Sequence, residues 1–182
     1  YLGAGDGLAA TAGWTAKGNQ PGAYFGYSVA AAGDVNGDGY GDVLVGAYLY
    51  DNGQTDEGRA YLYLGSAAGL AVAPAWTSES DQAGAHYSVG LASAGDVNGD
   101  GYDDVIVGSP YYSGPMLQEG RAYLFLGSAS GLTVSPAWTG ENNQADSRFG
   151  VSVAGTGDVN GDGYADVLVG AVFFDGGETD EG

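Results

Sequence analysis

The stretch GDVNGDGYGDVLVG, Gly33 to Gly46, alternates oxygen-bearing side chains with small residues and then runs directly into an apolar segment. The side-chain oxygens belong to Asp34, Asn36, Asp38 and Asp42. Such a pattern has three readings: an ion site, a solvated turn, or a pair of catalytic carboxylates. The rest of the sequence decides between them.

The same stretch returns twice, beginning at residues 95 and 157. The steps from Asp34 to Asp96 and from Asp96 to Asp158 are both 62 residues. Other segments keep this register, since EGRAYLYLGSAAGL at 57–70 matches EGRAYLFLGSASGL at 119–132. A period of this size predicts a solenoid, a propeller or an array, whose units bury their apolar faces against one another.

Within one unit the patterns are those of strands, at residues 27–33, 42–47, 59–65 and 75–77. The second and third segments are apolar on both faces, which is typical of a small sheet held between two other sheets. We therefore predict an all-β fold of about three 62-residue repeats, each a propeller blade of four antiparallel strands.

The chain ends interrupt the repeat, which gives one propeller segment over 1–182 with units at 1–15, 16–77, 78–139 and 140–182. The position within the repeat at which each chain end falls predicts the strands found there. The N-terminus should carry the end of a third strand and a fourth strand, and the C-terminus a first and a second strand. We expect these two half-blades to complement each other. Three units are too few for a ring, so further blades or a homo-oligomer would complete it.

The spacing of the repeated loop is typical of calcium. Side-chain oxygens fall at positions 1, 3, 5 and 9, a backbone carbonyl is available at position 7, and glycine at position 6 permits a sharp turn. An EF-hand would carry a glutamate at position 12, where this chain has Val45, Val107 and Val169. We predict three Ca²⁺ sites, with these ligands: Asp34, Asn36, Asp38, Tyr40, Asp42; Asp96, Asn98, Asp100, Tyr102, Asp104; Asp158, Asn160, Asp162, Tyr164, Asp166.

Two alternatives compete with calcium at these loops. Solvated Asx turns would leave the three carboxylates of each loop repelling one another, which a cation relieves. Acid/base catalysis needs one carboxyl held protonated in a poorly solvated pocket, and three equal copies argue for structure instead. We predict that the chain is not an enzyme.

Charge and composition exclude several classes of partner. Four Lys plus Arg stand against 23 Asp plus Glu, so the net charge of −19 repels nucleic acid and anionic membrane surfaces. The longest apolar runs are far shorter than a membrane span, which argues against membrane insertion, and the chain has no cysteine. Because it starts at Tyr1 without methionine, we expect a processed or trimmed fragment.

The units resemble FG-GAP repeats, the blades of the integrin α-subunit propeller. The residues that carry the resemblance flank the calcium-type loop: Phe25-Gly26, Gly46-Ala47, Phe149-Gly150 and Gly170-Ala171. The second unit departs, with Tyr87-Ser88 in place of Phe-Gly. The resemblance implies calcium loops between the first and second strand of each blade, an extracellular or cell-surface location, and a role in adhesion or ligand recognition. Similar repeats in fungal lectins leave a carbohydrate-binding propeller open, and near-identical units leave a self-assembling scaffold open.

The loops differ in how much they vary between units. The calcium-type loops are nearly identical, whereas the connections at 48–57, 110–119 and 172–181 differ from one another. In an antiparallel blade these connections lie on the face opposite the calcium-type loops. We predict that this face binds a protein or glycan ligand, the alternative being unselected drift of exposed loops. His86, which belongs to a variable loop, is expected to be a surface residue.

Two positions are identical in all units, a tryptophan and a glutamine: Trp14, Trp76, Trp138; Gln20, Gln82, Gln144. We expect the tryptophans to pack between blades rather than stack on sugars. The glutamines should hold the backbone of their loop. Arg59 and Arg121 follow Glu57 and Glu119, and we predict that they are local ion-pair or backbone partners.

Overall fold

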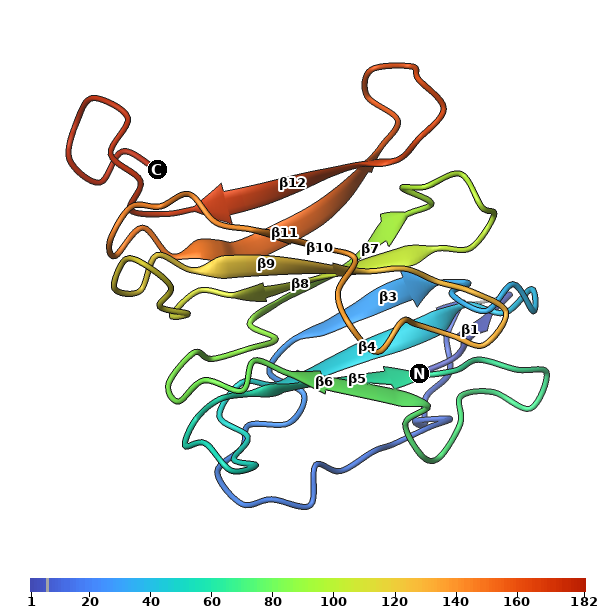
Figure 1. Cartoon of the computed structure of the whole chain (residues 1–182). Coiled ribbons are helices and arrows are strands. Elements are labelled where there is room, and N and C mark those ends of the chain that lie inside the picture. Colours follow the sequence, from blue (N-terminus) through green and yellow to red (C-terminus); the bar gives the residue numbers. More distant parts are fainter. Residues whose placement is uncertain (6) are drawn as a thin grey trace.

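The structure, a computed structural model, describes residues 1–5 and 7–182 and is built from antiparallel sheets stacked on one another (Figure 1). The first sheet contains β3 (Val29–Gly33), β4 (Asp42–Ala47), β5 (Arg59–Tyr63) and β6 (Trp76–Glu79). The second contains β7 (Gly90–Gly95), β8 (Asp104–Ser109), β9 (Arg121–Phe125) and β10 (Trp138–Gly140). The third pairs β11 (Phe149–Gly157) with β12 (Asp166–Ala171).

The order of strands in each four-stranded sheet follows the chain, as a propeller blade requires. This confirms the predicted all-β fold of four-stranded antiparallel blades. The fourth strand runs two residues farther than the predicted end at Thr77, because Arg59 of β5 lies opposite Glu79 of β6 and pairs with it.

Strand β4 is apolar throughout because its two faces pack against different layers. Leu44 lies in the core between the first and second sheets, with Val105 and Val107 of β8. Val45 points to the other side of the sheet, where it packs with Tyr61. Burial on both faces explains why these strands do not alternate between polar and apolar residues.

Strand β8 repeats this arrangement one layer farther along. Its Ile106 faces the third sheet and packs with Val167 and Val169 of β12. Leu168 of β12 points the other way and is 64% exposed, since no further sheet follows it in the described part of the chain. The stack therefore ends on an open apolar surface.

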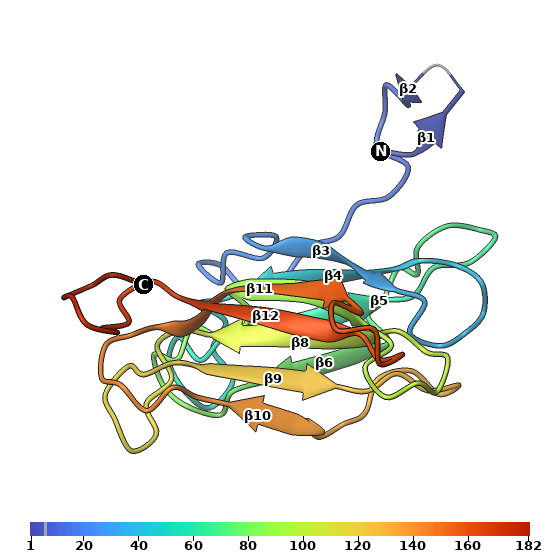
Figure 2. The same cartoon turned by 90° about the horizontal axis from the view of Figure 1, so that it is seen from above.

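The N-terminal segment differs from the predicted half-blade. It forms a small pair of strands, β1 (Gly3–Ala4) and β2 (Gly7–Leu8), and Trp14 lies in no strand. In Figures 1 and 2 this segment lies at the opposite end of the molecule from β12, so the expected pairing of the two half-blades does not form within one chain. The reason is that Trp14 packs on the face of the first sheet that points away from the second, whereas β12 packs beyond the second sheet, so the two chain ends lie on opposite sides of an open stack.

The first strands of the sheets lie next to one another along the inner edge of the stack. β3 contacts β7, and β7 contacts β11 (Figure 2). This is the arrangement of neighbouring blades around a propeller axis. The described sheets form an open stack, so closure of a ring stays a prediction.

The Phe-Gly and Gly-Ala pairs join the first two strands of a blade. The N–H of Gly26 donates to the carbonyl of Gly46 at 2.9 Å, while the Phe25 ring packs edge-on against Tyr61 at 5.3 Å between ring centroids. In the second blade Tyr87 takes the place of Phe25, and it is fully buried with its hydroxyl donating to Ser78 Oγ at 3.0 Å. Tyr87 thus fills the same packing role as Phe25, although it departs from the motif.

Candidate metal centres

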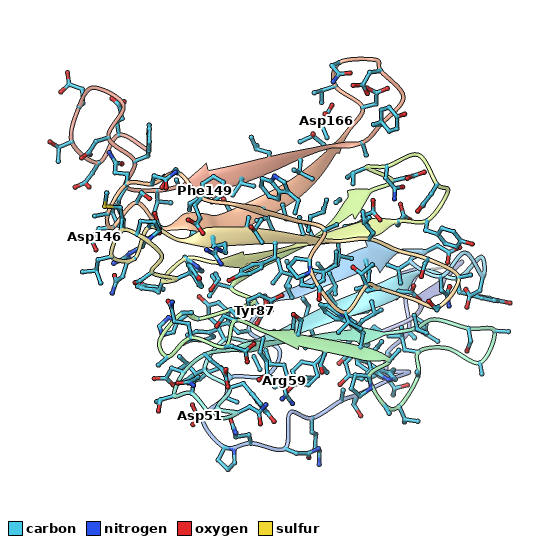
Figure 3. All side chains as sticks on the ribbon, in the orientation of Figure 1. Asp51, Arg59, Tyr87, Asp146, Phe149 and Asp166 are labelled. Carbon is cyan, nitrogen blue, oxygen red and sulfur yellow. The ribbon has the colours of Figure 1, made fainter. Side chains whose placement is uncertain are left out.

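The three repeated loops leave one edge of the stack, between β3 and β4, β7 and β8, and β11 and β12. Each begins at a register shift in the strand pair, where Gly33, Gly95 and Gly157 adopt positive φ of 82°, 73° and 68°. Such a bulge bends the strand so that the next residue, an aspartate, starts a tight loop. Asp166 marks this edge in Figure 3, and Asp146 marks the opposite one.

In the first loop the backbone curls around the side chain of Asp34. Its carboxylate accepts the N–H of Asp38 at 3.0 Å and of Gly39 at 2.7 Å. The carboxylate of Asp38 in turn accepts the N–H of Tyr40 at 3.0 Å, and the side-chain amide oxygen of Asn36 (Oδ1) accepts the N–H of Asp38 at 3.1 Å. The alternating side chains at positions 1, 3 and 5 are thereby turned toward the inside of the loop.

The second and third loops have the same geometry. Asp96 accepts three backbone N–H groups at 2.7 to 3.0 Å, and Asp158 accepts three at 2.6 to 3.1 Å. Slight burial opposes ionisation of Asp96, but the backbone donors outweigh it and lower the pKa of this carboxyl. The pKa of Asp158 is lowered mainly by the N–H of Gly163. Both carboxylates are therefore held ionised, as a cation site needs.

The aspartate at position 9 is placed differently from the others. Asp42 is buried, and its two carboxylate oxygens accept the N–H of Val35 at 3.0 Å and of Gly65 at 2.8 Å. It thus ties the start of the loop to the end of β5. Burial raises the pKa of Asp42, and the two backbone donors only partly oppose that effect. The sequence predicted Asp42 as a metal ligand, but it did not predict these hydrogen bonds to the backbone.

The donor set of each loop fits a hard cation such as Ca²⁺, because it consists of oxygens alone. Among the described residues no N–H donates to the carbonyl of Tyr40, Tyr102 or Tyr164, so the predicted ligand at position 7 keeps its lone pairs available. The three carboxylates of a loop do not all approach within 4.8 Å of one another; in the described chain that proximity occurs at Glu57, Glu79 and Asp81. The three calcium sites therefore stay a prediction, with the residues at positions 1, 3, 5, 7 and 9 as ligands.

Neighbouring loops are connected to one another. The N–H of Asp103 donates to the carbonyl of Asp34 at 3.2 Å, and the Asp103 carboxylate accepts the N–H of Asp34 at 2.8 Å. The N–H of Ala165 makes the corresponding bond to Asp96 at 2.9 Å. Position 8, which sequence reasoning passed over, is thus the link between blades.

On the opposite face, aromatic side chains from successive repeats gather into one cluster. Tyr48 lies 4.4 Å from Tyr27 and 5.4 Å from His86, measured between ring centroids. The Arg148 guanidinium lies over Tyr111 at 4.6 Å and over Phe173 at 4.8 Å.

A cavity of about 370 Å³ opens in the aromatic cluster itself, and one of about 390 Å³ lies between β6 and the β9–β10 connection of the next blade. Burial lowers the pKa of His86, which is half-buried in the cluster rather than a free surface residue. The sequence could not show the cluster, because its members come from separate repeats.

The repeated glutamines and tryptophans follow the prediction in part: each glutamine holds the backbone of a neighbouring loop rather than that of its own, and Trp138 is exposed. Gln82 donates to the carbonyl of Ser113 at 2.8 Å and accepts its N–H at 2.7 Å, and Gln20 and Gln144 make the same paired bonds to loops of their own units. The indoles of Trp14 and Trp76 donate across to the carbonyls of Ala71 and Thr133. These two tryptophans therefore pack between blades.

The predicted local pairing of the arginines with the preceding glutamates is wrong. Arg59 pairs with Glu79 on the adjacent strand, and Arg121 pairs with Glu141. Antiparallel register brings these residues side by side, whereas Glu57 lies before β5 and accepts the N–H of Asn52 at 2.6 Å.

Comparison with known proteins agrees with these repeats. A family model described as FG-GAP repeat matches residues 25–63, 90–125 and 149–182. The chain belongs to the FG-GAP repeat family. Integrin alpha-PS2 of Drosophila melanogaster is 40% identical over 175 residues, which cover 87% of this chain and 12% of that protein. Integrin alpha-IIb of Mus musculus is 39% identical over 161 residues, covering 85% and 15%.

This FG-GAP chain thus matches a small part of much longer relatives. Integrin alpha-5 of Xenopus laevis, 34% identical over 168 residues, is likewise covered only to 16% of its length. Within the residues described, the structure holds no helix with the length and apolarity to cross a membrane.

Proposed function

We propose that this chain is a calcium-binding FG-GAP propeller module for extracellular or cell-surface recognition and adhesion, in which calcium has a structural role. The observation that carries the proposal is the recurrence of one oxygen-lined loop three times, with the same backbone bonds to Asp34, Asp96 and Asp158. A single polar turn can arise from local preference alone, but three such loops aligned on one edge favour a common ligand.

Calcium would act by neutralising the loops and fixing the inner edge of each blade. Asp42 and Asp104 connect the first and second loops to the third strands of their sheets, and Asp103 connects these two loops to each other. An ion bound beside these carboxylates would restrain both connections at once. Extracellular calcium modules have dissociation constants of roughly 10⁻⁴ to 10⁻³ M, which suits sites kept filled by ambient calcium outside cells.

The aromatic cluster on the opposite face supports recognition of a protein ligand there. Tyrosine and arginine are the side chains enriched in protein interfaces, and Tyr24 and Tyr27 are both 60% exposed in this cluster. A glycan ligand is favoured less, because the indoles of Trp14 and Trp76 are already used in packing between blades.

Calorimetric melting with and without calcium tests the structural role. We expect calcium to raise the melting temperature, since a ligand that binds only the folded chain stabilises it by about 1.4 kcal/mol per site at ten times its dissociation constant. The triple variant D34N/D96N/D158N should lose most of this shift. Equal melting temperatures in calcium and in EDTA would contradict the proposal.

Selection of peptides from a displayed library tests the recognition face. Y48A should reduce peptide capture by the chain, whereas W138A, which removes an exposed aromatic side chain outside the cluster, should not. Capture lost in W138A and retained in Y48A, together with signals on a glycan array, would favour the lectin alternative instead.

A further inference from the structure

A second acidic site lies on the face opposite the repeated loops. One carboxylate oxygen from each of Glu57, Glu79 and Asp81 lies within 4.8 Å of the other two. They come from three places: the end of the connection between β4 and β5, the end of β6, and the start of the following connection. None of these residues belongs to the calcium-type loops, and no sequence motif joins them.

The buried member of the site has an unused oxygen. Glu57 is fully buried, and its Oε1 accepts the N–H of Asn52 at 2.6 Å. Its Oε2 is shielded from solvent and has no hydrogen-bond partner among the described residues. An unpartnered buried carboxylate oxygen is costly, so a bound cation or a proton is expected to satisfy it.

Local charge favours a divalent cation over a proton. Three carboxylates meet here, and the Arg59 guanidinium, paired with Glu79, offsets one of their charges. The remainder of two negative charges is what one divalent ion neutralises. A single proton would neutralise Glu57 only. Arg59 balances Glu79, so the negative charge of Asp81 would remain unbalanced.

The second blade supplies a natural comparison. Glu119 and Glu141 occupy the positions of Glu57 and Glu79, and Arg121 pairs with Glu141. The third position is Asn143, which adopts a φ of 57° where Asp81 adopts 55°. The backbone at this position is therefore alike in both blades, and Glu119 Oε2 is buried without a partner just as Glu57 Oε2 is, so the second blade differs in having one carboxylate fewer.

We propose that Glu57, Glu79 and Asp81 bind a divalent cation with a preference for oxygen ligands, calcium being the best fit. Oxygens within 4.8 Å of one another suit a shell with metal–oxygen distances of about 2.3 to 2.6 Å. A polar cavity of about 390 Å³ beside Glu79 and Asp81 gives room for the waters that complete the shell. The bound ion connects the β4–β5 connection to the end of β6, on the face opposite the repeated loops.

Counting bound ions in matched variants tests the site independently of how many ions the three loops hold. The chain is dialysed against about 10 mM calcium chloride, roughly tenfold above the range for extracellular modules, and bound calcium is measured by mass spectrometry of the metal. D81N reproduces the second blade, whose backbone accepts asparagine, and should bind one ion fewer per chain than the unaltered protein. D51N removes the same charge from an exposed position in the β4–β5 connection, which also carries Glu57, and should bind as many ions as the unaltered protein.

E57Q distinguishes a cation from a proton. The amide resembles a protonated carboxyl, so a proton at Glu57 predicts unchanged calcium binding in E57Q and D81N alike. The cation predicts that both variants lose one ion, and that N143D gains one by completing the site in the second blade. Calcium counts that are equal in the unaltered chain, D81N and E57Q overturn the proposal.

Discussion

The aspartate at position 9 shows how one side chain serves two purposes. In the second blade Asp104 is fully buried, and its carboxylate accepts the N–H of Val97 at 2.9 Å and of Gly127 at 2.8 Å. Burial raises the pKa of Asp104 despite these donors. The carboxylate therefore holds the blade together even before any ion binds.

Replacing Asp104 by asparagine should destabilise the chain in the absence of calcium. One carboxylate oxygen becomes an NH₂ group facing a backbone donor, which leaves a buried N–H unpaired and costs about 1–3 kcal/mol. Urea unfolding in EDTA measures the loss as a lower midpoint at unchanged slope. D56N is the control, since Asp56 is only partly buried and adopts a φ of 53° that asparagine tolerates. Equal losses in both variants would refute the assigned bond.

At the scale of elements, the sheets approach one another most closely where glycine leaves room. A Cβ added to Gly108 of β8 would lie 1.8 Å from the carbonyl oxygen of Gly150 on β11. The neighbouring atom is backbone, so it cannot move aside without shifting a strand. The glycine that Gly108-Ser109 shares with the Gly-Ala pairs of the other repeats is thus a requirement of packing between the second and third sheets.

The variant G108A should therefore destabilise the stack by about 1–3 kcal/mol or more, the usual cost of overpacking a core. G41A is a matched control: a Cβ there meets nothing within 4 Å, and the third repeat already carries Ala165 at that position. Thermal unfolding followed by circular dichroism compares the two. A G108A chain as stable as G41A would show that the third sheet does not pack as described.

At the scale of the whole molecule, charge dominates. The net charge is −19, and three calcium ions would reduce it to −13. Self-repulsion of this size opposes the compact state, most strongly at low ionic strength, where charges interact over about 30 Å at 0.01 M salt. The loops gather part of this charge on one edge, where ions can neutralise it.

Sodium chloride should consequently raise the melting temperature of the calcium-free chain. Screening shortens the range of repulsion to about 8 Å at 0.15 M salt. With calcium bound, the rise should be smaller, because part of the repulsion is already neutralised. Calorimetric scans at both salt concentrations, with and without EDTA, check this. A melting temperature independent of salt in EDTA would contradict the role given to charge.

Local pattern determined most of the fold. The alternation of Asp34, Asn36 and Asp38, the glycines at the bulges and the doubly apolar second and third strands all act within a few residues, so the sequence by itself indicated the loops, the blades and their repetition. The same holds for Gln82, whose repetition marked a fixed contact before its partner was known.

Only the tertiary structure decided which side chains meet across blades and strands. Arg59 pairs with Glu79 because antiparallel register aligns them, although Glu57 is nearer in sequence. The aromatic cluster around Tyr48 and the acidic site at Asp81 unite residues from distant segments. Proximity of this kind depends on how sheets stack and how loops return, which a pattern of neighbouring residues does not contain.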